Sequence, residues 1–376
     1  MRISVYIDSL NFGGAEILLL NILTLLKSKG YKISVITLKG NYTLEKKFSN
    51  IFMISKKNIF SFFLDILRSD SIGYIHLSKA TLISCIACNI RKLLNFDKRI
   101  FFIHEHTSFH YHSNRKYINK KIFDFFYKKI LLFSLKRGLV NLIVSTKARY
   151  DEVSNFNKNN SIIYIFPNSF LESYKRDLIQ TNLFNKTEFL EGNVITLATI
   201  SRIERVKQIE WAILSANSLA NNYKKKIIKL IIVGTGTDTK RLKKLSSSIK
   251  KNNLQIIFNG FAENTIDIFK KIDFFLFPSL NEGFPLGLTE AAMTGISCIA
   301  NDCEHGPKEI ANHFPNVNLV SPANYINFED KIYSQVKLIE KSNINNSKNI
   351  YNAINSWPSL ESIVEKFHQD VLQNYL

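Results

Sequence analysis

Short apolar runs alternate with amphipathic segments along most of the chain. The first run, residues 3–7, alternates apolar and polar positions and is followed by a loop at 10–14. A segment whose apolar residues recur at helical spacing comes next, and a second apolar run occupies 33–38. A strand, a helix and a second strand in this order make one βαβ unit, from which a doubly wound parallel sheet is built.

The alternation is interrupted once, between about residue 173 and residue 192, where the chain is polar and aperiodic. Further apolar runs lie on both sides of this stretch, at 74–77, 99–103, 141–145, 161–166, 194–200, 227–233, 254–258, 272–277 and 297–300. Because 376 residues exceed the usual size of a single core, we predict two domains. Both are doubly wound α/β domains, at 1–175 and 190–355, and a helix at 356–376 packs on the first.

The composition of the chain indicates what kind of partner it binds and in which compartment it lies. The chain has 50 Lys and Arg against 31 Asp and Glu, a formal net charge of +19, which favours an anionic partner such as phosphate, nucleic acid or an acidic membrane. Its cysteines lie in apolar surroundings, which predicts buried thiols in a reduced, cytoplasmic chain. No run approaches the roughly 18 apolar residues of a spanning helix, so we expect neither a signal peptide nor a membrane anchor.

The most informative stretch, residues 277–295, has the pattern of a buried strand, a sharp loop and a helix. The loop–helix junction presents backbone N–H groups and the positive end of the helix dipole at the carboxyl edge of a parallel sheet, where doubly wound folds bind phosphorylated ligands. Glu282 lies in the loop and Glu290 about one turn into the helix. The two carboxylates therefore face one crevice at different depths and can serve different hydroxyl groups.

These residues resemble the retaining family 4 glycosyltransferases, within the glycosyl transferases group 1, whose Glu-x7-Glu motif is matched by Glu282 and Glu290. The resemblance spans nearly the whole chain and implies the GT-B architecture: two Rossmann-like domains facing a central cleft, the first for the acceptor and the second for the nucleotide sugar. It implies that Glu290 binds the ribose hydroxyls, while Glu282 and the N–H groups of Gly283 and Phe284 hold the donor sugar. Leu286 is a further donor-binding residue by the same resemblance. The structural alternative is a helix-capping Glu290 and a solvated Glu282.

A second match is the basic loop after the run at 194–200. Here Arg202 and Lys207 stand at the spacing that the family uses against the donor diphosphate. Fixed cations can stabilise the negative charge that develops when a nucleoside diphosphate leaves. The chain contains no Asp-x-Asp, which supports metal independence. The resemblance also implies no cofactor other than the donor substrate. In so basic a protein, the alternative is ordinary surface charge.

Further candidates follow other predicted strands. His106 is our candidate for the residue near the transferred sugar, with His104 as the alternative register. Together with His110 and His112 these imidazoles also suggest a metal site, but no carboxylate or Cys frame completes one. By the resemblance, a glycine loop of the first domain faces the diphosphate and sugar, and two strand ends of the second domain seat the nucleotide base and phosphates. The residues concerned are Gly13, Gly14, Gly234, Gly236 and Phe261.

Residues 115–137 combine eight Lys or Arg and one Asp with interleaved aromatic and leucine side chains. One interpretation is a basic amphipathic helix that binds an anionic membrane surface peripherally and so brings a lipid-linked acceptor to the enzyme. The other is a helix whose aromatic side chains face the core while its lysines meet water. The sequence leaves both open.

We expect a hexosyltransferase that moves a sugar, with retention of configuration, from a nucleotide-diphosphate donor to a lipid-linked glycan acceptor. A UDP-sugar is favoured over a GDP-sugar as donor, and the setting implied by the resemblance is capsule, O-antigen, lipopolysaccharide or exopolysaccharide synthesis at the cytoplasmic face of the inner membrane. One rival is a sugar-nucleotide epimerase or hydrolase of the same fold. A remote rival is a basic nucleic-acid-binding protein, whose affinity would fall steeply with salt. No nucleic-acid recognition motif is present.

Overall fold

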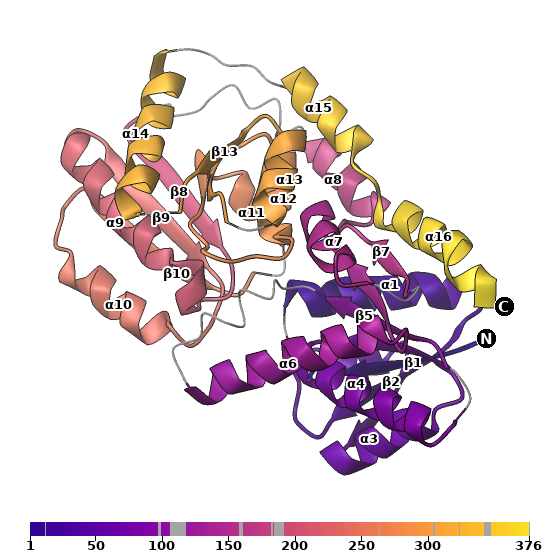
Figure 1. Cartoon of the computed structure of the whole chain (residues 1–376). Coiled ribbons are helices and arrows are strands. Elements are labelled where there is room, and N and C mark those ends of the chain that lie inside the picture. Colours follow the sequence, from indigo (N-terminus) through magenta and orange to yellow (C-terminus); the bar gives the residue numbers. More distant parts are fainter. Residues whose placement is uncertain are drawn as a thin grey trace. The chain divides into compact units, whose positions relative to one another are not determined.

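The computed structural model describes residues 1–376 except 12, 97–98, 106–117, 158–160, 182, 184–191, 263, 304, 323, 342–346 and 376. The chain forms two compact units (Figure 1). Unit 1 comprises Met1–Leu171 and Ser359–Leu376, and unit 2 comprises Glu172–Pro358. Each unit is a parallel sheet with helices on both faces, so the predicted fold class, two Rossmann-like α/β domains, is confirmed.

The sheet of unit 1 has the strand order β3-β2-β1-β4-β5-β6-β7. Its strands are β1 Arg2–Ile7, β2 Lys32–Leu38, β3 Met53–Lys57, β4 Ile72–His76, β5 Phe101–Glu105, β6 Asn141–Val144 and β7 Ile163–Ile165. Its helices are α1 Gly14–Ser28, α2 Glu45–Ser49, α3 Ile59–Arg68, α4 Ser78–Leu93, α6 Ile118–Lys136, α7 Lys147–Ser154, α16 Leu360–Asp370 and η3 Leu372–Tyr375.

Two hydrophobic clusters cover the faces of this sheet. Because side chains alternate along a strand, Val5 belongs to one cluster and its neighbour Tyr6 to the other. The first cluster contains residues of α1 and α16, and the second contains residues of α3, α4 and α6. The apolar alternation at residues 3–7 therefore builds two cores at once.

The sheet of unit 2 has the order β10-β9-β8-β11-β12-β13. Its strands are β8 Val194–Ile200, β9 Ile227–Val233, β10 Leu254–Gly260, β11 Phe274–Phe277, β12 Ser297–Asn301 and β13 Val317–Val320. Its helices are α8 Glu172–Thr181, η2 Arg205–Lys207, α9 Ile209–Asn222, α10 Thr239–Ser248, α11 Ile266–Phe269, α12 Leu286–Met293, α13 Gly306–His313, α14 Tyr325–Lys341 and α15 Ser347–Ser356.

The structure differs from the predicted elements in three places. The stretch expected to be a linker contains α8, whose buried positions are Lys175 and Leu178, so its apolar period is too weak to predict a helix. The strands β3 and β13 were not predicted, because β3 lies at the sheet edge with partly exposed side chains and β13 has only four residues. Finally, β5 extends to Glu105, so that His104 lies within the strand and not after it.

The C-terminal segment Ser359–Leu376 belongs to unit 1. The ring of Phe367 on α16 lies 5.7 Å from that of Phe102 and 5.1 Å from that of Tyr164. The Tyr31 hydroxyl and Nδ1 of His368 are 2.9 Å apart. The helix therefore completes the core on the α1 side of the sheet.

All four cysteines are free and buried, as predicted. Burial raises the pKa of each thiol, including Cys85 to about 12. Among the residues that the structure describes, no helix is long and apolar enough to cross a bilayer.

Candidate functional site

The strand order of unit 2 reverses between β8 and β11. From β8 the chain adds β9 and β10 on one side, and it then adds β11, β12 and β13 on the other. Doubly wound sheets bind ligands outside the carboxyl ends of the strands at such a point. The loop at 201–207 follows β8 and the loop at 278–285 follows β11, so both loops with predicted site residues lie here.

An ion pair joins the two loops. Nζ of Lys207 lies 2.6 Å from Oε1 of Glu282, and both side chains are largely buried. The backbone N–H of Leu280 also donates to the carbonyl oxygen of Val206, at 2.9 Å. A pair withdrawn from water in this way is held in place only while both charges are present, because either one alone would be costly to bury.

The loop after β12 supports this pair. The Cys303 thiol lies beside it: burial raises the pKa of Cys303, the Glu282 carboxylate raises it further, and the Lys207 ammonium lowers it. The backbone N–H of Gly306 donates to the carbonyl oxygen of Gly283 at 2.9 Å. A Cβ at position 306 would lie 2.5 Å from that oxygen, so this close approach of two backbones requires glycine.

Arg202 belongs to the same loop as Lys207 but faces water. Its side chain is 60% exposed, and Nη1 lies 3.1 Å from Oε1 of Glu204. An exposed pair of this kind contributes little to stability, and an incoming anion can compete for the guanidinium. The structure thus places one predicted cation against Glu282 and leaves the other at the surface of the loop.

The two glycines after β9 are needed by the neighbouring backbone. Gly234 has φ +131°, and a Cβ there would collide with the carbonyl oxygen of Ser201. A Cβ at Gly236 would collide with the carbonyl oxygen of Ile203, whose N–H donates to the Thr235 carbonyl at 2.9 Å. The close approach that these glycines permit is therefore made to the loop that carries Arg202.

Glu290 occupies a separate environment from Glu282. It lies in the second turn of α12 and accepts a hydrogen bond from the Thr265 hydroxyl at 3.2 Å and another from Tyr174. Burial raises the pKa of Glu290 and the two hydrogen bonds lower it. Burial has the larger effect, and the resulting pKa is about 7. The two carboxylates of the Glu-x7-Glu motif are therefore held differently, one by a cation and the other by hydroxyl groups.

The start of α12 lies between Glu282 and Glu290 in the sequence. The helix begins at Leu286, directly after the turn of Gly283 and Phe284. The Phe284 ring packs against Trp357, with 5.8 Å between ring centroids, so its side chain is part of the core. What this turn offers to a ligand is therefore backbone N–H groups and the positive end of the helix. Phe261, after β10, is 46% exposed.

Several predicted residues lie in unit 1. Gly13 is the N-cap of α1, which begins at Gly14. His106 lies outside the described residues. His104 is buried within β5, where its Nδ1 lies 2.5 Å from the Tyr74 hydroxyl. The carboxylate of the next residue, Glu105, pairs with Arg149 and accepts a hydrogen bond from Tyr127, so this part of the His-rich stretch is built into the core.

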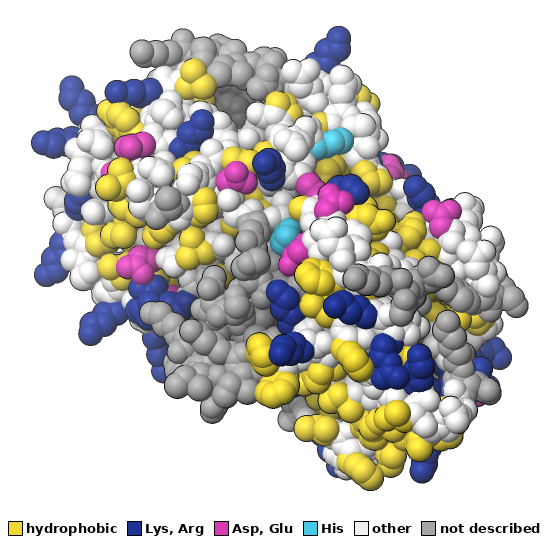
Figure 2. Space-filling model, viewed as in Figure 1, with side chains coloured by type: hydrophobic (Ala, Val, Ile, Leu, Met, Phe, Trp, Pro, Cys, Tyr) yellow, Lys and Arg dark blue, Asp and Glu magenta, His cyan; other side chains and the backbone are white. Residues whose placement is uncertain are grey.

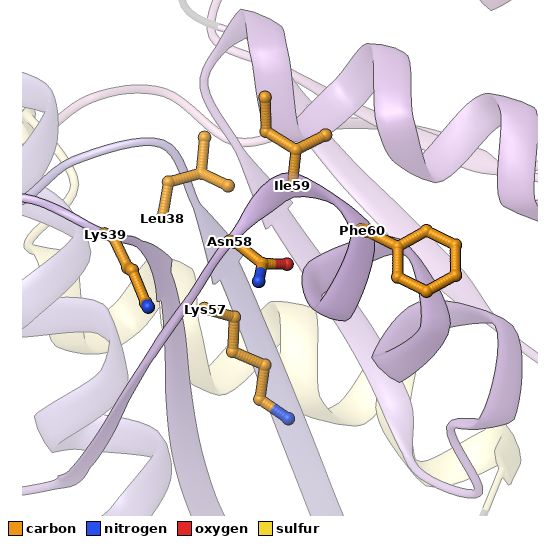
Figure 3. A pocket seen from close by; sticks show the side chains of 6 residues that line it. All are labelled: Leu38, Lys39, Lys57, Asn58, Ile59 and Phe60. Carbon is orange, nitrogen blue, oxygen red and sulfur yellow. The ribbon is translucent and has the colours of Figure 1, made fainter.

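A pocket of unit 1 opens at the carboxyl ends of β2 and β3 (Figure 3). Leu38, Ile59 and Phe60 give it an apolar lining, and Ile59 and Phe60 are exposed. Lys39 and Lys57 also line it. The pocket thus combines apolar surface with cations.

Comparison with known proteins identifies the second half of the chain. Residues 180–356 match the family Glycosyl transferases group 1. The chain carries a group 1 glycosyltransferase domain. It is 26% identical, over 81% of each chain, to an uncharacterized glycosyltransferase of Haemophilus influenzae. It is also 26% identical, over 37% of this chain and 38% of the relative, to lipopolysaccharide 1,6-galactosyltransferase of Escherichia coli.

Solved structures resemble the chain over its full length. A structure of Anabaena Alr3699/HepE in complex with UDP and glucose has a TM-score of 0.73 at 15% identity, over 99% of both chains. The lipopolysaccharide outer core galactosyltransferase WaaB in its apo form has a TM-score of 0.66 at 14% identity, over 100% of both. These likenesses confirm the GT-B fold, and with the group 1 domain they support glycosyltransferase activity.

Two residues that contact the Glu-x7-Glu motif were absent from the sequence prediction. Thr265 and Tyr174 both bond Glu290, but they come from the start of α11 and from α8, far from it in sequence. Neither lies in a pattern that marks a site, since Tyr174 falls in the polar stretch expected to be a linker. Only the folded arrangement of unit 2 brings these side chains to the Glu290 carboxylate.

Proposed function

We propose that the chain is a retaining family 4 hexosyltransferase that transfers a sugar from a UDP-sugar to a lipid-linked glycan acceptor. The main support is the ion pair of Lys207 and Glu282, with 2.6 Å between Nζ and Oε1. It lies where the strand order of a group 1 domain reverses. UDP is supported by the similarity to HepE, whose structure is a complex with UDP and glucose. Capsule, O-antigen or exopolysaccharide synthesis is supported by similarity to a lipopolysaccharide galactosyltransferase.

The proposed reaction depends on charge held in place before the donor arrives. Lys207 and Arg202 take up the negative charge that forms on the leaving diphosphate, assisted by the N–H groups at the start of α12. Because Lys207 is held by Glu282 and Arg202 can turn toward the incoming diphosphate, the proposed step needs no metal. The leaving phosphate acts as the base for front-face attack by the acceptor, so retention requires no protein nucleophile.

The carboxylates orient the donor. Glu282 fixes Lys207 and accepts a hydrogen bond from a sugar hydroxyl, while Glu290 accepts from the ribose hydroxyls. Gly234 and Gly236 keep the Arg202 loop in register, and Phe261 borders the base. In unit 1, Gly13, Gly14 and His106 are proposed to serve the sugar and diphosphate.

Acceptor binding is proposed for unit 1, which holds residues 1–171 of the acceptor domain predicted at 1–175. The pocket of Figure 3 supports a carrier lipid that bears phosphate, because apolar side chains there adjoin Lys39; the second lysine of the lining, Lys57, is paired with Asp65. We also propose peripheral contact of residues 115–137 with the cytoplasmic face of the inner membrane, where such a carrier would be found.

A thermal-shift panel of UDP, GDP and their sugars tests the donor. A ligand that binds only the native state adds about 2.7 kcal/mol to the free energy of unfolding at a hundredfold excess over Kd. The melting temperature rises as a result. We expect UDP and one UDP-sugar to stabilise the protein. No shift with any nucleotide would overturn the proposal.

Substitution at the ion pair tests the site. Glu282→Ala should reduce turnover by about a hundredfold while the protein stays folded. The matched control is Asp267→Ala, which removes the carboxylate of an exposed pair with Lys270 in the same unit and should retain full activity. Wild-type turnover by Glu282→Ala would refute the assignment. Product analysis with and without acceptor separates transfer from epimerisation or hydrolysis.

A further inference from the structure

Two hydroxyl groups from distant parts of unit 2 meet at the Glu290 carboxylate. The Thr265 hydroxyl donates to Oε2 of Glu290 at 3.2 Å, and Tyr174 forms a second hydrogen bond with the same carboxylate. The two hydroxyl oxygens lie 3.4 Å apart. Glu290 belongs to α12, Tyr174 lies on α8 and Thr265 directly precedes α11. Three separate elements of the unit therefore build one polar network.

The Thr265 hydroxyl departs from the usual role of its position. Thr265 is the N-cap of α11, where a threonine hydroxyl normally accepts a hydrogen bond from a backbone N–H of the first turn. Within the described residues 264–269 its side chain makes no such bond, and Oδ1 of Asn264 accepts from the Ile266 N–H at 3.0 Å. The Thr265 hydroxyl is thereby free of the helix end and donates to Glu290. A local rule set aside in this way indicates a role at the distant carboxylate.

Tyr174 reaches the carboxylate from a helix that is anchored in unit 2. Its neighbour on α8, Lys175, is buried and donates from Nζ to the Trp357 carbonyl oxygen at 2.7 Å. Burial raises the pKa of the Tyr174 phenol, and the carboxylates of Glu290 and Asp177 raise it further. The phenol therefore stays protonated at neutral pH and can donate a hydrogen bond.

The two hydrogen bonds favour the ionised form of Glu290 without filling it. Burial raises the pKa of this carboxyl and the bonds lower it, with a resulting pKa of about 7. An ionised carboxylate can accept about four hydrogen bonds, so two donors leave room for two more. The 2′- and 3′-hydroxyls of a ribose would supply that number.

We propose that Tyr174 and Thr265 are positioning residues of the donor site, which orient the Glu290 carboxylate as an acceptor for the ribose hydroxyls of the nucleotide. This inference rests on the proposed function, in which Glu290 binds the ribose, and adds two residues that act through Glu290. The alternative is that both hydroxyls only stabilise the fold by satisfying a buried carboxylate. In that case their removal lowers stability and leaves ribose recognition unchanged.

Ribose recognition can be measured separately from the attraction of the diphosphate. Figure 2 shows Lys and Arg side chains spread over the face that it displays, and the chain has 50 of them against 31 Asp and Glu. Such a surface attracts the diphosphate of any nucleotide. Dideoxy-UDP, which lacks the 2′- and 3′-hydroxyls, keeps this attraction. The ratio of its Kd to the Kd of UDP, obtained by calorimetry from about pH 6 to about pH 8.5, therefore reports on the ribose alone.

Removal of either hydroxyl should displace the pH dependence of this ratio. In the wild type the ratio should rise as pH passes upward through about 7. In Tyr174→Phe and in Thr265→Val the rise should lie about one pH unit higher, because each lost hydrogen bond favoured the charged carboxylate. At neutral pH the ratio should then be about threefold smaller than in the wild type, and most of the difference should vanish at the highest pH. Thr265→Ser keeps the hydroxyl and should retain the wild-type profile.

The matched control is Tyr325→Phe, which removes a phenol bonded to the Glu329 carboxylate elsewhere in unit 2. It should leave the ratio unchanged at every pH. Melting temperatures without nucleotide verify that each variant folds. The inference is overturned if Tyr174→Phe and Thr265→Val both keep the wild-type profile while UDP still binds. Failure of the wild type to bind UDP is a different result, which overturns the proposed donor site and the inference with it.

Discussion

The Thr265 hydroxyl donates a hydrogen bond of 3.2 Å to the Glu290 carboxylate. Tyr174, on α8, bonds the same carboxylate. Burial nevertheless dominates, and the pKa of Glu290 rises to about 7. A group that titrates near neutrality inside the proposed nucleotide site should make both stability and nucleotide binding depend on pH.

The first prediction concerns stability. The folded protein keeps the Glu290 proton up to a pKa of about 7, whereas the unfolded chain loses it near 4.5. Between these values the native state binds more protons, so this residue makes the free energy of unfolding fall as pH rises. Urea unfolding of the wild type and of Glu290→Gln should show the difference between them changing by on the order of 2 kcal/mol across that interval. A constant difference would contradict the raised pKa.

The second prediction concerns the nucleotide. If Glu290 accepts hydrogen bonds from the ribose hydroxyls, the protein with ionised Glu290 binds UDP more tightly, because hydrogen bonds to a charged acceptor are stronger. UDP affinity measured by calorimetry should therefore rise about tenfold as pH passes upward through 7. Glu290→Gln, or UDP lacking the 2′- and 3′-hydroxyls, should remove this dependence. A pH profile retained by both would exclude the ribose contact.

The third prediction concerns the Lys207–Glu282 pair. Lys207→Met leaves a largely buried carboxylate alone and should destabilise unit 2 by roughly 3 kcal/mol. The double variant Lys207→Met, Glu282→Gln should recover part of this loss, since no unpaired charge remains. Chemical denaturation of the four proteins gives the coupling energy. Simple additivity of the two single changes would show that the pair is not coupled.

The fourth prediction compares two glycines of unit 2 that both have positive φ. Gly234→Ala places a methyl group against the Ser201 carbonyl oxygen, whereas Gly260→Ala, at φ +73°, meets nothing within 4 Å. Gly260→Ala should cost about 1 kcal/mol from backbone strain alone, and Gly234→Ala about 3 kcal/mol or more. Thermal unfolding checks both. Equal losses would mean that the Arg202 loop moves aside freely.

The sequence predicts the buried parallel strands well, because each is a largely apolar run. The runs at 194–200 and 227–233 coincide with β8 and β9. The edge strand β3 and the helix α8 were not predicted, because their buried faces carry too few apolar residues. The carboxyl ends of β8 and β11 could be identified as one edge of a sheet, but not the ion pair across them. The hydrogen-bond partners of Glu290 could not be predicted either, because Tyr174 on α8 and Thr265 at the start of α11 reach α12 only in the folded unit.

The return of the last helix to unit 1 has a consequence for synthesis on the ribosome. Unit 2 is continuous from Glu172 to Pro358, so all of its residues are made before the chain ends. Unit 1 still lacks Phe367 at that stage, and the rings of Phe102 and Phe166 remain without their cover. The half made first is therefore completed last, and a premature stop within α16 would leave unit 2 whole while unit 1 lacked part of its core.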